Sequence, residues 1–234
     1  MQKYSNKYVI RTSECDNNFN IRLSALWDIM QDVAVHHAGF LGFGHETMLK
    51  NGNFFALMRM NVKIKRYPKS QEKITVETYP AGIYKIFCVR KYNIFDEKGE
   101  KIAEGTSLWI IVDAGSNRPL RPNKAYPKAQ FTNSNYEGET PEKIGIPESF
   151  DFLRKVTAEF CDIDANNHVN NSRYINWLEN AIRPDRAPIK ELNANYVLET
   201  KIGDELDILR NSDTFVLKDK EGNERFAAEV KFWS

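Results

Sequence analysis

Two polar stretches of the chain, Asp16-Asn17-Asn18-Phe19-Asn20 and Asp164-Ala165-Asn166-Asn167-His168, lie 148 positions apart and share their aspartate and one asparagine. An amphipathic segment follows each stretch, because apolar residues recur at three- and four-residue steps over about 23–38 and about 172–182. A polar turn followed by a helix therefore occurs twice, which indicates an internal repeat.

Runs rich in β-branched and aromatic residues surround the two predicted helices and favour strands. The predicted strands of the first half cover residues 54–66, 74–79, 84–95 and 102–112. Those of the second half cover 153–160, 193–200, 205–209, 214–219 and 225–233. The hairpin-type turns Asp96-Glu97-Lys98-Gly99 and Asp219-Lys220-Glu221-Gly222 occupy equivalent places near the end of each half. The simplest architecture is α+β, with two similar units that each pack one helix on an antiparallel sheet and are related by a pseudo-two-fold axis.

Regular patterning lapses between residues 113 and 150, where five of the nine prolines occur. Clustered proline and glycine disfavour both helix and strand, so this stretch is typical of a connection between domains. We predict an N-terminal domain over 1–128, a linker over 129–150 and a C-terminal domain over 151–234.

The charge balance argues against a protein that binds nucleic acid through bulk charge. Lysine and arginine total 33 and aspartate and glutamate total 32, for a net charge of +1 over 234 residues, whereas such proteins carry a basic excess. The apolar runs are far shorter than the roughly 20 residues of a membrane span. The chain starts without an apolar signal region, so we expect no membrane span and no secretory targeting.

The three cysteines, Cys15, Cys88 and Cys161, are widely spaced and odd in number. This pattern is neither a disulfide framework nor a zinc motif. We expect reduced thiols in the cytoplasm, with Cys161 buried in a strand, and we expect no metal site.

The second polar stretch is the strongest candidate for chemistry. Asp164, Asn166 and His168 stand two positions apart, so an extended backbone would project them to one face. A helix follows, capped by Asn170, Asn171 or Ser172, and its free N–H groups favour developing negative charge. A histidine, a carboxylate and an amide in this place can bind water and an oxyanion.

The alternative interpretation is that these residues only form a turn and cap a helix. The repeat favours a site, because the first copy has Asn20 where the second has His168. Two copies of a turn, of which only one carries an imidazole that titrates near neutrality, indicate one working site and one lapsed copy.

The segment Asp162-Ile163-Asp164-Ala165-Asn166-Asn167-His168-Val169-Asn170-Asn171, together with Tyr174, resembles the D-[LI]-D-x-N-x-H-V-N-N-x-x-Y signature of the acyl-acyl-carrier-protein (acyl-ACP) thioesterases. These plant and bacterial enzymes release fatty acids from carrier protein. Arg59-Met60, Arg66-Tyr67-Pro68 and Gly105-Thr106-Ser107-Leu108-Trp109 are similar to landmarks of the family's first half. The resemblance implies a tandem (double) hot-dog fold, in which each repeat wraps an antiparallel sheet around a long helix.

The family's catalytic group falls on Asp164, Asn166 and His168, with a fourth member on a later strand. The element Tyr196-Val197-Leu198-Glu199 resembles that strand, and the resemblance alone assigns Glu199. Many members have a cysteine after this glutamate. Here the position is Thr200, so the resemblance does not extend to a cysteine nucleophile.

By this resemblance we expect a hydrolase that cleaves fatty acyl-ACP, releases free fatty acid and ends fatty acid synthesis, with acyl carrier protein as partner and no cofactor. The acyl chain is expected in the first hot-dog, along the predicted helix 23–38. The alternatives are an acyl-CoA thioesterase, a dehydratase-type hot-dog enzyme and a non-catalytic acyl-thioester-binding protein. The sequence leaves open the acyl chain length, the proton acceptor among His168 and Glu199, and whether the protein forms a homodimer.

Overall fold

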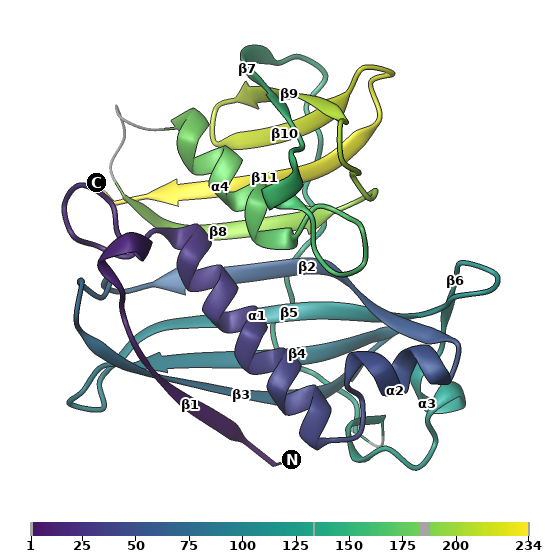
Figure 1. Ribbon diagram of the computed structural model, residues 1–234. Coiled ribbons are helices and arrows are strands. Elements are labelled where there is room, and N and C mark those ends of the chain that lie inside the picture. Colours follow the sequence, from purple (N-terminus) through teal and green to yellow (C-terminus); the bar gives the residue numbers. More distant parts are fainter. Residues whose placement is uncertain (1, 133, 183–187, 234) are drawn as a thin grey trace.

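The computed structural model describes residues 2–132, 134–182 and 188–233 (Figure 1). The first half contains β1 (Tyr4–Val9), α1 (Leu23–Phe40), α2 (His45–Lys50), β2 (Asn53–Ile64), β3 (Lys73–Tyr84), β4 (Phe87–Phe95), β5 (Lys101–Asp113) and β6 (Arg118–Leu120). The short helix α3 (Pro122–Ala125) follows. The second half contains β7 (Asp151–Thr157), α4 (Asn171–Ile182), β8 (Ile189–Tyr196), β9 (Glu205–Asn211), β10 (Thr214–Asp219) and β11 (Glu224–Phe232).

A single antiparallel sheet joins the two halves. Its strand order is β1-β3-β4-β5-β2-β8-β11-β10-β9-β7, so the second half mirrors the first across the contact between β2 and β8. At this seam Asn61 lies opposite Asn193, and the Asn61 amide donates to Glu191 Oε1 over 3.0 Å. The prediction of two α+β units related by a pseudo-two-fold axis is confirmed, and the two sheets are continuous.

Each long helix lies against the strands of its own half (Figure 1). In α1 the apolar stripe faces the sheet, and Leu26, Trp27 and Met30 have no exposed surface. Gly105 on β5 allows this close approach, since a Cβ atom there would lie 2.6 Å from Met30 Cε and 3.3 Å from the Asn61 carbonyl oxygen. This packing is the double hot-dog arrangement that the family resemblance implies.

The repeated hairpins have the same geometry. Asp96 and Asp219 each donate their N–H across the turn, to Glu100 and Asn223 respectively, over 3.0 Å. The glycines of the two turns are left-handed, with φ of 80° at Gly99 and 82° at Gly222. The equivalence inferred from the two sequences therefore extends to the backbone.

Two strand predictions differ from the structure for identifiable reasons. β3 continues past residue 79 to Tyr84, because Pro80 and Gly82 form a β-bulge rather than a turn, with Gly82 at φ 124°. β8 ends at Tyr196 instead of residue 200. Beyond that point Val197 donates its N–H to the Arg225 carbonyl oxygen over 3.0 Å, so Glu199 lies after the strand rather than on it.

The stretch predicted as a linker packs against the sheet of the second half. Ile144 is buried with Val216 and Ala227, and its N–H donates to Asn195 Oδ1 over 3.0 Å. The domain boundaries at 128 and 151 stay a prediction.

The cysteines are free, but the prediction for Cys161 was wrong. Cys161 is exposed in a single 3₁₀ turn, Phe160–Asp162, since β7 already ends at Thr157. Among the described residues, none of the helices has both the length and the apolar content to cross a membrane.

Truncating the buried face of α1 should destabilise the fold. Leu26→Ala removes a fully buried side chain, and we expect the free energy of unfolding to fall by about 2–5 kcal/mol. Val35 on the same helix is 61% exposed, so Val35→Ala should change it by about 0.5 kcal/mol or less. Urea unfolding of both variants tests this, and equal losses would contradict the packing described.

Candidate active site

The second polar stretch forms a tight turn. Asp164 N–H donates to the His168 carbonyl oxygen over 2.8 Å, and Ile163 and Val169 pair as an antiparallel bridge. Asn167 occupies the left-handed region at φ 61°. The backbone therefore folds back on itself, and the extended conformation considered for these residues was wrong.

The Asp164 carboxylate holds this turn from inside. Its Oδ1 accepts the backbone N–H of Asn166 at 2.8 Å and that of His168 at 3.4 Å. Its Oδ2 accepts the Asn166 side-chain amide at 3.3 Å. The aspartate and asparagine predicted as site residues thus fix the backbone that carries His168.

The fourth predicted residue meets the histidine directly. His168 Nε2 lies 3.0 Å from Glu199 Oε2, with the two side chains 29% and 51% exposed. Glu199 reaches His168 through tertiary structure, since the two residues are far apart in the sequence. The Val169 N–H donates to the Thr200 carbonyl oxygen over 2.9 Å and so ties the segment after β8 to the turn. All four predicted residues therefore lie in one place, with the His168–Glu199 pair open to solvent.

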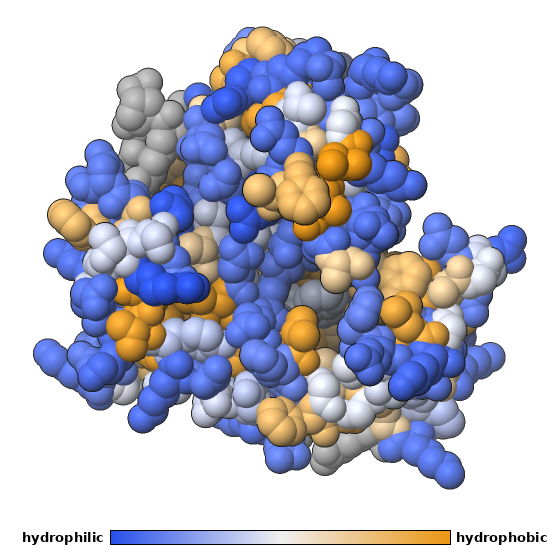
Figure 2. All heavy atoms as spheres, viewed as in Figure 1, coloured by the Kyte–Doolittle hydropathy of each residue, from blue (hydrophilic) through white to orange (hydrophobic). Residues whose placement is uncertain are grey.

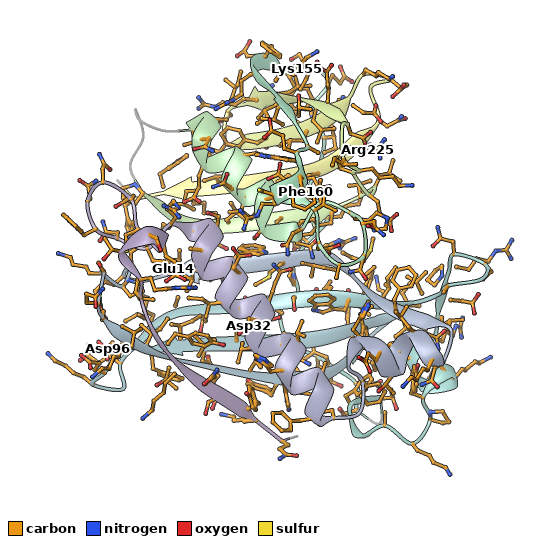
Figure 3. All side chains as sticks on the ribbon, viewed as in Figure 1. Glu14, Asp32, Asp96, Lys155, Phe160 and Arg225 are labelled. Carbon is orange, nitrogen blue, oxygen red and sulfur yellow. The ribbon has the colours of Figure 1, made fainter. Side chains whose placement is uncertain are left out.

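Large apolar side chains stand exposed in the segments that carry this pair. Phe160, four residues before Asp164, is 83% exposed, and Leu198 and Ile202 on either side of Glu199 are 51% and 59% exposed. Figure 2 shows hydrophobic groups set among hydrophilic ones on this face, and Figure 3 labels Phe160 in the second half. The site thus has apolar surroundings that a hydrocarbon or another protein can contact.

Arg225 at the start of β11 anchors the glutamate and was missed by sequence reasoning. Its Nη1 donates to the Glu199 carbonyl oxygen, and its Nε and Nη2 lie 3.0 and 2.8 Å from Asp219 Oδ2. Figure 3 labels Arg225 in the second half. Burial opposes ionisation of Asp219, but hydrogen bonds from Asn223 and Arg225 outweigh it and lower the pKa of this carboxyl. The sequence pointed to Arg225 only indirectly, because its partner Asp219 belongs to the hairpin that is repeated in both halves.

The first copy of the turn has the same backbone without the same chemistry. Asp16 Oδ1 accepts the N–H of Asn18 at 2.9 Å and that of Asn20 at 3.0 Å. Phe19 stands at φ 60°, as Asn167 does at φ 61° in the second copy. The repeat therefore holds at the level of single hydrogen bonds, and the first copy presents an amide where the second presents an imidazole.

The helix that follows the turn 164–168 starts at an asparagine cap. Asn170 Oδ1 accepts the Ser172 N–H at 3.0 Å, which selects Asn170 among the three predicted caps. The Tyr196 hydroxyl donates to the Asn171 carbonyl oxygen at 3.0 Å. Burial raises the pKa of Tyr196 well above its ordinary value, so this hydroxyl stays protonated and remains a donor.

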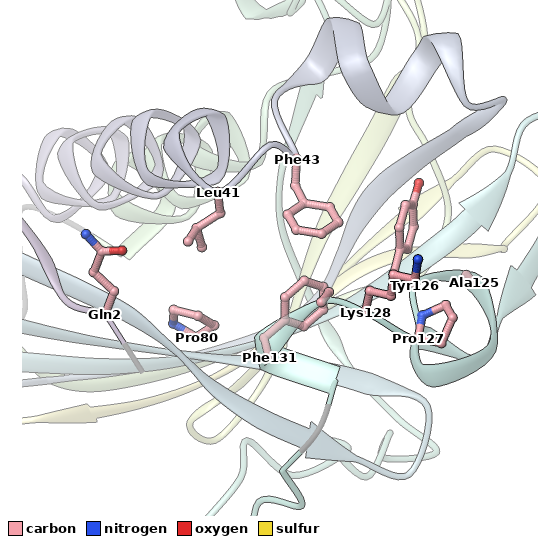
Figure 4. Close-up of a pocket in the computed structure, with 10 residues that line it drawn as sticks. Gln2, Leu41, Phe43, Pro80, Ala125, Tyr126, Pro127, Lys128 and Phe131 are labelled. Atoms are coloured by element: carbon pink, nitrogen blue, oxygen red, sulfur yellow. The ribbon is translucent and has the colours of Figure 1, made fainter.

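An apolar cavity of about 480 Å³ lies at the C-terminal end of α1 (Figure 4). Leu41, Phe43, Pro80 and Phe131 line it, and the rings of Phe43 and Phe131 meet edge to face at 5.0 Å. The lining residues that the structure describes belong to the N-terminal part of the chain, and none of them lies in the turn that carries His168. Over the described ranges, no group of three or more histidine, cysteine, aspartate or glutamate side chains is arranged to hold a metal ion.

Solved structures with the same fold include thioesterases. An acyl-ACP thioesterase from Bacteroides thetaiotaomicron superposes with a TM-score of 0.85 at 24% identity, covering 99% of this chain and 98% of that one. The 12:0-ACP thioesterase from Umbellularia californica superposes with a TM-score of 0.83 at 21% identity, covering 98% and 96%. Both support the double hot-dog fold.

Curated relatives are similar at low identity. The chain is 25% identical to oleoyl-acyl carrier protein thioesterase 2 of Arabidopsis thaliana, over 90% of this chain and 63% of that protein. It is 26% identical to palmitoyl-acyl carrier protein thioesterase of Gossypium hirsutum, over 77% and 48%. The match thus spans about half to two thirds of the relatives' length.

Two family models cover most of the sequence. The acyl-ACP thioesterase N-terminal domain matches residues 1–129, and the acyl-ACP thioesterase C-terminal domain matches residues 148–231. The order of these domains agrees with the two halves of the sheet. The chain belongs to the acyl-ACP thioesterase family.

Proposed function

We propose that this protein hydrolyses the thioester of fatty acyl-ACP in the cytoplasm, releases free fatty acid and so ends fatty acid synthesis. The observation that carries the proposal is the His168–Glu199 contact of 3.0 Å beside the start of α4. The names of the curated relatives, oleoyl- and palmitoyl-acyl carrier protein thioesterases, support the substrate class. The free thiols of the described cysteines support a reducing compartment.

The His168–Glu199 pair supplies the base. A water molecule bound between the pair and the substrate loses a proton to the pair as its oxygen attacks the thioester carbonyl carbon. When the tetrahedral intermediate collapses, the carbon–sulfur bond breaks, and the carrier thiol leaves with the proton that the pair held. The products are a fatty acid and free carrier thiol, and the balance needs no cofactor.

The start of α4 supplies the electrophilic assistance. Free N–H groups at a helix N-terminus point outward and carry partial positive charge. They stabilise the negative charge that develops on the thioester oxygen. Asp164, by holding the backbone N–H of Asn166 and His168, keeps the imidazole in register with that helix start.

The acyl chain is proposed to extend along α1 into the first half. The cavity at the C-terminal end of α1 is apolar and lies in the half whose turn has Asn20 in place of His168. Burial of hydrocarbon there gains free energy in proportion to the apolar area removed from water. The N-terminal half would then bind the acyl chain while the C-terminal half cleaves it. A homodimer stays a prediction.

Product analysis separates this function from its alternatives. Purified protein is incubated with acyl-ACP of several chain lengths and with the matching acyl-CoA, and products are identified by mass spectrometry. We expect free acid, released faster from acyl-ACP than from acyl-CoA. An altered acyl chain indicates a dehydratase, an unchanged ligand indicates a binding protein, and faster release from acyl-CoA indicates an acyl-CoA thioesterase; each contradicts the proposal.

The two copies of the turn should differ in their effect on turnover. His168→Ala removes half of the base pair, so we expect kcat to fall about 10²–10⁴-fold. Asn20→Ala, at the equivalent position of the first copy, should leave kcat within about threefold of wild type. Steady-state kinetics on acyl-ACP, with thermal unfolding as the folding control, tests this, and equal losses at both positions would defeat the one-site interpretation.

Glu199, not Thr200, should carry the chemistry. Glu199→Gln keeps the shape but removes the carboxylate, and we expect kcat to fall by about 10² or more. Thr200 is fully buried, so its hydroxyl is out of reach of a thioester, and Thr200→Ala should retain substantial hydrolysis. Quenched reactions should contain no acyl group on the protein; an acyl-enzyme mapped to Thr200 would establish a covalent mechanism instead.

A further inference from the structure

The two long helices contact each other through equivalent residues. Gln31 of α1 and Glu179 of α4 lie 148 positions apart, the offset of the repeat. The structure places each of these side chains against the start of the opposite helix. The two residues therefore have the same place in the fold but different chemistry, a neutral amide in one half and a carboxylate in the other.

Glu179 accepts the first backbone N–H groups of α1. Its Oε1 accepts the backbone N–H of Leu23 at 2.8 Å, and its Oε2 accepts that of Ser24 at 3.0 Å. A carboxylate held by two N–H groups at a helix N-terminus is a strong, charge-assisted arrangement. The helix start beside the lapsed turn is thus already occupied by an anion of the protein itself.

Gln31 contacts the start of α4 differently, through side chains rather than backbone N–H groups. Its Oε1 accepts the Asn171 side-chain amide at 3.0 Å, and its Nε2 donates to Asn170 Oδ1 at 3.3 Å. Among the residues that the structure describes, none accepts a hydrogen bond from the Asn171 backbone N–H, the counterpart of the Leu23 N–H. Gln31 therefore holds the start of α4 in place through side chains and leaves its first backbone N–H without an acceptor from the described residues.

We propose that Gln31 is a positioning residue of the hydrolytic site, whose neutral amide orients Asn170 and Asn171 and leaves the first N–H of α4 free for the thioester oxygen. The inference rests on the proposed function and deepens it. It explains the asymmetry of the repeat. The start of α1, which follows the turn with Asn20, receives the Glu179 carboxylate on its N–H groups. The start of α4, which follows the turn with His168, receives the neutral Gln31 amide and keeps its first N–H free.

Electrostatics give the reason that the side chain at position 31 is neutral. A glutamate there could reach the N–H groups of Asn171 and Ser172, as Glu179 reaches those of Leu23 and Ser24. It would take the Asn171 N–H that the developing oxyanion needs and add a like charge beside it. The same contact would stabilise the start of α4 in the folded protein. A variant with glutamate at position 31 should therefore be more stable and turn over more slowly than wild type.

The decisive variant is Gln31→Glu, assayed on acyl-ACP. We expect kcat to fall about 10²-fold or more, because one oxyanion donor is worth about 10²–10³ in kcat. KM should stay within about threefold of the wild-type value, and the unfolding temperature should equal or exceed that of wild type. The matched control is Glu179→Gln, which should lower the unfolding temperature while kcat stays within about threefold of wild type.

A second variant keeps the proposal falsifiable if Gln31→Glu does not fold. Gln31→Met preserves the length of the side chain but removes both hydrogen bonds, and we expect a fall in kcat of about tenfold with little change in KM. Wild-type kcat in the folded Gln31 variants would overturn the proposal. So would an equal loss of kcat in Glu179→Gln, since the effect would then belong to helix packing in general.

Nuclear magnetic resonance separates failure of this inference from failure of the proposed function. In Gln31→Glu the backbone amide protons of Asn171 and Ser172 should shift downfield as they bond to the new carboxylate. This shift does not depend on the substrate, so it would be observed even if the wild-type protein hydrolysed no acyl thioester. Unshifted amide protons in a folded variant would contradict the contact itself.

Discussion

The packing of α1 against α4 across the β2–β8 seam is the contact on which the rest of the structure depends. The two helices bring the start of each against the middle of the other, as the contacts of Glu179 with Leu23 and of Gln31 with Asn171 show. The turn that carries His168 precedes α4, so its place relative to the first half is fixed by the same contact. A single hot-dog unit would leave its helix start without the partner side chain that the other half supplies.

The repeat separates what the backbone provides from what the side chains provide. Both turns hold an aspartate that binds the backbone N–H groups of the residues two and four positions later, and both contain a left-handed residue. The shared turn geometry thus precedes a helix that packs against the sheet in both halves. The two copies differ in their side chains, and only the second turn carries an imidazole, His168, which contacts the Glu199 carboxylate.

Glu199 combines an exposed side chain with a backbone that its neighbours hold in place. Glu199 is half exposed and follows a strand, where a carboxylate could adopt several orientations. The backbone contacts on either side restrict it, since Arg225 binds the Glu199 carbonyl oxygen and the Thr200 carbonyl oxygen accepts the Val169 N–H. The side chain stays accessible to solvent, while its backbone is held by these contacts. Exposed Phe160 and Leu198 add apolar surface in the same segments.

The sequence by itself determined the elements that depend on local patterning. Helix periodicity located α1 and α4, alternation and β-branched residues located most of the strands, and the matched polar stretches established the repeat and His168. Glu199 followed only from the family resemblance, because no local pattern distinguishes it from other glutamates. The bulge at Gly82, the end of β8 at Tyr196, the Arg225 anchor and the contrast between Gln31 and Glu179 came only from the tertiary structure. These features depend on contacts between residues far apart in the chain, whereas periodicity reports only which face of an element is buried and not which residue it meets.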